Sequence, residues 1–220
     1  MSEAGPRQFF WRGVRVPFIA PWSSEVRIHV PLVRPPNLRG GGIGYADENP
    51  RVDRRHGILW VRMPAVRGVG EPRLAGVHAL RQRQAMTHLL CQVCGTSTYP
   101  RRDERHLFLM GERNGRPIVE GERTAVPPVH EECAAEALRN CSHLRRGAVA
   151  ARVEYPSPWG VAGILHDPQT LTALPAPTNQ DLDFVPHGHP DLRWIIAARD
   201  IVTLHGCTPI DIDQLMPLAA

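Results

Sequence analysis

Alternation of apolar and polar positions predicts two strands in the first third of the chain. Residues 25 to 33, EVRIHVPLV, place an apolar side chain at every second position, which is the period of a half-buried strand. A long segment rich in Pro, Gly, Asn and Asp follows, and we expect a loop there. Residues 58 to 63, ILWVRM, predict the second strand.

Further strands are predicted downstream. Residues 106 to 110 and 116 to 120 flank the turn GERNG, whose Asn114-Gly115 step is typical of a β-hairpin. The segments GAVAARVEY and WGVAGILH predict two more strands, joined by a turn at the sequence PSP. CTPIDIDQL, at residues 207 to 215, predicts a short edge strand.

Three segments carry helical patterns. Residues 74 to 90 could share a broad apolar face, with Arg81, Arg83 and Gln84 directed outward. The segment from about 130 to 146 begins after Pro-Pro with two glutamates and ends in arginines before a glycine, as the helix dipole favours. DLRWIIAARDIVTLHG, residues 191 to 206, predicts a third helix.

These elements predict an α+β fold with mixed or antiparallel strands and three helices. We expect three segments: an Arg-rich β and loop region (1–73), a helix-to-helix module (74–147) and a C-terminal α/β region (148–220). Neither outer segment has enough strands for a complete core of its own, so we expect one compact unit. The longest apolar runs are too short to cross a membrane, and the first residues lack the apolar stretch of a secretory signal, so we expect a cytoplasmic protein.

Charge is unevenly distributed along the chain. All 26 basic residues are arginine, which is typical of codon bias in a GC-rich genome; the alternative is a surface whose clustered arginines make bidentate phosphate contacts. Residues 1 to 90 hold 14 Arg against 6 acids, whereas residues 151 to 220 hold 3 against 8. The basic half could contact nucleic acid or an acidic protein partner, or it could pair with the acidic part of the same chain.

Four residues form two pairs with the spacing of metal ligands. Cys91 and Cys94 are a CxxC at the end of the first helix, and His130 and Cys133 are an HxxC at the start of the second. Zinc prefers four tetrahedral sulfur or nitrogen ligands, and two paired half-sites commonly supply them. We therefore predict a Zn²⁺ site at these residues.

The order of knuckle, hairpin and helix resembles a treble-clef zinc finger over residues 89 to 146, with His in place of the commoner Cys at the third ligand. The segments RQRQAMTHLLCQVCG, HEECAAEALRNCSHLRRG and RWIIAARDIVTLHGC also resemble a family of actinobacterial proteins, which implies no activity.

Alternatives remain open at the sequence level. The CxxC could be a redox pair, although such motifs open a helix and this one follows a helix, or the cysteines could simply be buried. Cys141 and His143 could replace one ligand or build a second site.

For function, four protein ligands leave no open position for water, so we predict a zinc-stabilised binding or assembly protein that is not an enzyme. The alternative is a metal-dependent nucleic-acid enzyme similar to the His-Asn-His nucleases, suggested by Asn140 and His143. The preceding strand offers only His106 for its remaining histidine.

Overall fold

The computed structural model describes residues 5–36, 40–99, 105–112, 115–176 and 181–216. Across these ranges the α+β class is confirmed, with α-helices, 3₁₀ turns and antiparallel or mixed sheets. The helices are α1 (Pro50–Asp53), α2 (Ala79–Thr87) and α3 (Glu131–Asn140), and the 3₁₀ turns are η1 (Leu144–Arg146), η2 (Pro190–Arg193) and η3 (Ile212–Gln214). The strands are β1 (Phe10–Trp11), β2 (Val14–Arg15), β3 (Leu32–Val33), β4 (Gly44–Tyr45), β5 (Arg54–Arg55), β6 (Ile58–Trp60), β7 (His106–Gly111), β8 (Arg123–Thr124), β9 (Ala148–Val153), β10 (Tyr155–Leu165), β11 (Asp183–Pro186), β12 (Ile195–His205) and β13 (Thr208–Ile210).

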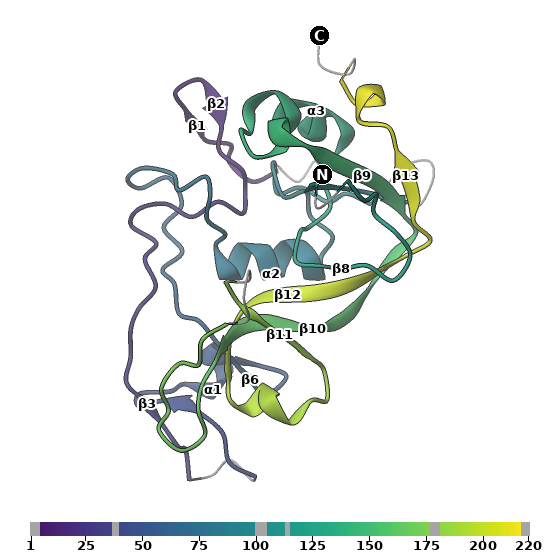
Figure 1. Ribbon diagram of the computed structural model, residues 1–220. Helices are drawn as coiled ribbons and strands as arrows, with labels where there is room; N and C mark the ends of the chain where they lie inside the picture. The colour runs from purple at the N-terminus through teal and green to yellow at the C-terminus, as the bar shows by residue number, and fades with distance from the viewer. Residues whose placement is uncertain (1–4, 37–39, 100–104, 113–114, 177–180, 217–220) are drawn as a thin grey trace.

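Two long antiparallel strands, β10 and β12, form the centre of a six-stranded sheet. Five of its strands follow the order β11-β10-β12-β6-β5, and the sixth, β8, pairs with β12. On its other side β12 pairs in parallel with β6 near its start and antiparallel with β8 near its end. Figure 1 shows α2 lying along β12, with α3 beyond it at one end of the molecule. The sheet draws strands from all three predicted segments, and the division into those segments stays a prediction.

The third predicted helix, residues 191 to 206, is wrong. Only η2 is helical there, and Ile195–His205 is strand β12. The segment is rich in β-branched residues, which suit a pleated strand, and β10 pairs with it along its whole length. A short apolar segment can satisfy both helix and strand periods, and here the long-range pairing decided between them.

One predicted turn and one predicted hairpin pairing are also wrong. The sequence PSP does not separate two strands: Pro156, Ser157 and Pro158 all lie within β10. The hairpin after β7 is absent as well, because β7 pairs with β9 and residues 116 to 119 are not in a strand. Asn114 itself lies outside the described residues.

The strand predicted at residues 25 to 33 forms only at Leu32–Val33, which pair with β4. Val26 and Ile28 are about half exposed, so the alternation does not mark a buried face there. The other predicted strands are confirmed in part: β6 covers the first half of residues 58 to 63, β7 covers 106 to 110, and β13 is the edge of a three-stranded sheet.

The two central helices are shorter than predicted. α2 begins after His78, and its Arg81 is directed inward, contrary to prediction, where it contacts the buried carboxylate of Glu25 at 2.6 Å. α3 ends at Asn140, before the separate 3₁₀ turn η1. α3 packs on the sheet β13-β9-β7 through buried side chains that include Leu107, Leu138 and Ala150. The cysteines of the predicted metal site belong to this same core.

Candidate metal centre

The first half-site is a tight turn that directs two sulfur atoms inward. The Cys91 amide donates to the Thr96 carbonyl at 2.7 Å, and the Gly95 amide donates back to the Cys91 carbonyl at 2.8 Å. Gly95 has a φ of +77°, and a Cβ at this position would lie 2.6 Å from the Phe18 ring. Only glycine fits this turn without strain. The local sequence thus shapes the knuckle, which we define as residues 91 to 95.

The second half-site is the first turn of α3. His130 is the N-cap residue with extended backbone, and its side chain makes no capping hydrogen bond. Cys133 follows three residues later, so both side chains project from the same face of the helix start. The Gln92 amide donates to the Pro128 carbonyl at 2.9 Å, which joins the knuckle to the segment that leads into α3.

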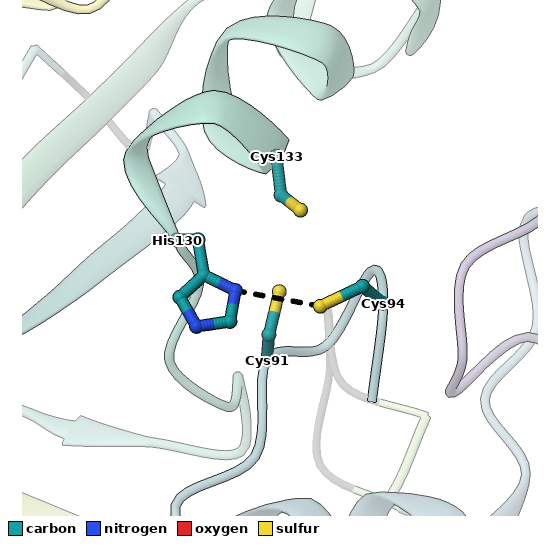
Figure 2. Close-up of side chains that lie close together, drawn as sticks. All are labelled: Cys91, Cys94, His130 and Cys133. Carbon is teal, nitrogen blue, oxygen red and sulfur yellow. Dashed lines mark hydrogen bonds between the residues drawn. The ribbon is translucent and has the colours of Figure 1, made fainter. Parts of the chain in front are cut away.

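The four donor atoms of Cys91, Cys94, His130 and Cys133 all lie within 4.8 Å of one another. Figure 2 shows the three sulfur atoms and His130 Nδ1 converging on one point between the knuckle and α3. Donors about 2.0–2.3 Å from a tetrahedral zinc ion are roughly 3.5–3.8 Å apart, so the cluster is close enough to hold a metal ion. The three cysteines are buried and free of disulfides, and His130 is half-buried.

The orientation of His130 is fixed from outside the cluster. Its Nε2 lies 2.9 Å from the Ser97 carbonyl, an atom that can only accept, so this nitrogen carries the proton. Nδ1 faces the sulfur atoms, 3.3 Å from Cys94 Sγ, and in the neutral imidazole its lone pair points toward them. Metal-bound histidines commonly donate their second N–H to such a carbonyl. Sequence reasoning missed Ser97, because a carbonyl acceptor leaves no side-chain pattern.

Within the cluster, negative charge is favoured on Cys94 and disfavoured on Cys133, whose pKa is raised by its hydrogen bonds with Cys91 and Cys94. Hydrogen bonds from Cys133 and then Cys91 lower the pKa of Cys94 far below that of an ordinary thiol, although burial opposes this shift. The Thr96 hydroxyl, 3.1 Å from Cys94 Sγ, acts in the same direction. Hydrogen bonds with Cys91 and Cys94 raise the pKa of His130 to about 10 without metal, so a bound metal ion would displace the Nδ1 proton. Thiolate is the form in which cysteine binds metal.

Cys141 and His143 do not belong to this cluster. Cys141 is the C-cap residue of α3, and His143 Nδ1 lies 2.9 Å from an Arg146 nitrogen. The Asn140 amide donates to the Glu136 carbonyl in its own helix. His106 is buried, with Nδ1 3.0 Å from the Thr98 hydroxyl. The residues that suggested a nuclease therefore make separate local contacts and do not form one site.

Many arginines of the N-terminal half have partners within the chain. Arg54 pairs with Glu48, Arg62 with Asp53, and Arg81 with Glu25, all in the same half. Two more reach later segments, where Arg15 contacts Glu136 and Arg55 contacts Asp200. Pairing inside the chain thus accounts for much of this positive charge.

Among the described residues, no helix has the length and apolar character needed to cross a bilayer. No protein-family model, curated protein or solved structure matches the chain.

Proposed function

We propose that Cys91, Cys94, His130 and Cys133 bind one Zn²⁺ ion and that the ion stabilises the fold. The observation that carries this proposal is the complete set of four converging donors, with the imidazole already oriented by Ser97. Three sulfurs and one nitrogen are a ligand set that zinc prefers over magnesium or calcium, which bind oxygen.

A structural role follows from the number of ligands. Four protein ligands complete the tetrahedron, so no position remains for a reactive water. The ion would join the knuckle to α3 inside the core that also contains Leu107 and Leu138. Its binding free energy would then contribute directly to the stability of the folded chain.

The module that would hold the zinc resembles a treble-clef zinc finger. Its support is the order of knuckle, strand β7 and helix α3, with the second ligand pair in the first turn of that helix. We propose that this module is non-enzymatic and serves binding or assembly, since zinc would serve its architecture. The partner proposed is a nucleic acid or an acidic protein surface.

Support for such a partner comes from exposed arginines. Arg7, Arg12, Arg51 and Arg73 are exposed and have no ion pair among the described residues. If they contact phosphates, affinity for a DNA duplex should fall steeply with salt, with a slope near −0.9 per contact. Absence of binding at low salt would exclude nucleic acid and leave the acidic protein surface.

The zinc proposal is tested by metal analysis of the purified chain. We expect one zinc per chain, and Cys133→Ser should lower both the zinc content and the thermal stability. Cys141→Ser is the matched control, because this free cysteine lies at the other end of α3. Co²⁺ substitution should give the intense absorption of a tetrahedral thiolate site in the control and not in Cys133→Ser. Equal metal content in the two variants would overturn the proposal.

A further inference from the structure

A serine, a histidine and a glutamate form a connected hydrogen-bond chain on the six-stranded sheet, in residues that the zinc site does not use. Ser157 Oγ lies 2.9 Å from His205 Nε2, and His205 Nδ1 lies 2.9 Å from Glu120 Oε1. A carboxylate only accepts hydrogen bonds, so Nδ1 carries the imidazole proton. Nε2 is then free to accept the proton of Ser157, which is the arrangement of a serine nucleophile and its base.

The sheet holds this chain of residues on one face. Ser157 in β10 is paired with Thr203 in β12, and Tyr155 is paired with His205, so their side chains project to the same side. On the opposite face of β12, Val202 and Leu204 are buried in the core. The nucleophile and base therefore lie on the two longest strands of a packed sheet, which fixes their separation.

Glu120 is oriented by the backbone that follows β12. Its Oε2 accepts hydrogen bonds from the Gly206 amide at 2.7 Å and from the Cys207 amide at 3.4 Å. The hydrogen bond with His205 lowers the pKa of Glu120, so the carboxylate stays charged at neutral pH. Tyr155 stacks on the His205 ring with centroids 4.7 Å apart, which restricts rotation of the imidazole.

A cation lies on the same face. Arg123 in β8 is directly paired with Thr203, so Arg123, Thr203 and Ser157 form one row across three strands. The Arg123 guanidinium stacks 4.4 Å from the ring of Trp159, which shows that it reaches across β12 to β10. Arg123 is exposed and has no hydrogen bond or ion pair in the part of the chain that the structure describes.

The local backbone explains why a side chain must supply this positive charge. Residues on both sides of Ser157 are prolines, which have no N–H to donate to a developing oxyanion. A register shift between Pro158 and Gly160 leaves Trp159 without a partner on β12, and such bulges redirect side chains near functional sites. Arg123, positioned by Trp159, can stabilise the oxyanion, as backbone amides do in serine hydrolases.

We propose that Ser157, His205 and Arg123 are catalytic residues for hydrolysis of carboxylic esters, with Glu120 as the positioning residue of His205. Ser157 Oγ attacks the ester carbonyl while its proton moves to His205 Nε2, and Arg123 stabilises the oxyanion. The C–O bond of the ester breaks, and the leaving alcohol takes the proton from His205. Water then attacks the acyl-Ser157 with His205 as base, which releases the acid and restores the hydroxyl.

The surrounding surface indicates the substrate class. Tyr155 is 57% exposed and Phe184, whose ring lies 6.5 Å from that of Trp159, is 41% exposed. Exposed aromatic rings bind planar aromatic groups by stacking. The site should therefore favour aryl esters, whose leaving phenolate needs little protonation. This inference goes beyond the proposed zinc function and needs no metal, so the two proposals can fail separately.

The test uses the zinc-loaded full chain with p-nitrophenyl acetate and, separately, a fluorophosphonate probe. We expect Ser157→Ala to reduce hydrolysis to the buffer rate and to abolish labelling of the peptide that contains residue 157. His205→Gln should lower kcat/KM by about 10²–10⁴-fold, the contribution typical of a general base. Arg123→Leu should lower kcat by about 10²–10³-fold, as loss of an oxyanion donor does.

Matched controls separate this site from background reactivity. Ser24→Ala removes a hydroxyl that donates to the Val69 carbonyl, and His189→Gln removes an imidazole beside Asp191 that has no serine partner. Both variants should hydrolyse the ester at the wild-type rate. Acylation at any other residue, or undiminished hydrolysis by Ser157→Ala, would overturn the proposal.

The positioning role of Glu120 has its own readout. In the free protein, the Nδ1 proton of His205 should give a downfield NMR resonance that Glu120→Gln removes and Glu120→Asp retains. The same Gln variant should lose hydrolysis, and the Asp variant should recover part of it. A Gln variant that unfolds more easily but keeps full activity would show that Glu120 only caps the Gly206 amide, which would contradict its assigned role.

Discussion

Replacing Arg81 by methionine tests how the chain before α2 is held against this helix, which leads into the knuckle. Arg81 donates to both carboxylate oxygens of Glu25, at 2.7 and 2.6 Å, and to the Ala20 carbonyl at 2.8 Å. Glu25 is 1% exposed and Arg81 is 5% exposed. Arg81→Met therefore leaves a buried carboxylate with the Trp22 amide as its remaining close hydrogen-bond donor.

The expected loss of unfolding free energy is about 3–5 kcal/mol, the range for removing one partner of a buried ion pair. At roughly 2–4 °C per kcal/mol for a chain of this length, the melting temperature should fall by about 6–20 °C. The double variant Arg81→Met with Glu25→Leu should recover most of this loss, since two apolar side chains leave no buried charge. Urea unfolding followed by circular dichroism gives the unfolding free energy of the wild type, the single variant and the double variant.

The contribution of the Glu25–Arg81 pair to stability should change with pH in a direction that follows from the pKa of Glu25. Burial acts to raise the pKa of Glu25, but hydrogen bonds from Arg81 and the Trp22 amide lower it overall. The wild-type pair thus contributes stability above the ordinary carboxyl pKa, and this contribution is lost as the pH falls through the lowered value. In Arg81→Met the lowering by Arg81 is lost, so burial, the largest influence, should outweigh the remaining Trp22 hydrogen bond and raise the pKa of Glu25. Relative to the double variant, the stability of Arg81→Met should therefore increase on acidification. A single variant within about 0.5 kcal/mol of the wild type at pH 7, the ordinary range for surface changes, would refute the reasoning.

Three further predictions concern other buried contacts. Gly95→Ala should lower stability by about 1–3 kcal/mol through backbone strain and contact with Phe18, and calorimetry should show weaker zinc binding; unchanged affinity would contradict the role of this turn. Asp53→Asn should cost about 1–3 kcal/mol at pH 7, because Arg62 lowers the pKa of Asp53 through two hydrogen bonds. That difference should begin to shrink in acid unfolding curves as the pH falls below about 4, the ordinary pKa of Asp, and should vanish only below the lowered pKa of the folded protein. Gln82→Leu should speed hydrogen exchange at the Asp200 amide, which donates to the Gln82 side chain at 3.0 Å.

Local spacing determined the metal half-sites. Cys91 and Cys94 are brought together by their own turn, and His130 and Cys133 by the first turn of one helix. Each pair depends on contacts within a few residues, which short-range sequence rules describe well. The residue types also set the chemistry, since sulfur and imidazole select zinc. The sequence also predicted that the two pairs come together, because a tetrahedral zinc site needs four ligands and each pair supplies two.

Tertiary structure alone decided the rest. Residues 195 to 205 could satisfy a helix or a strand, and pairing with β10 selected the strand. β7 took β9 as its partner instead of the segment beside it in sequence. Ser157 and His205 are 48 residues apart, and Glu120 and His205 are 85 apart, so no local pattern could have joined them. Such contacts depend on strand register across the whole sheet, which forms from many weak pairings that no single segment of sequence contains.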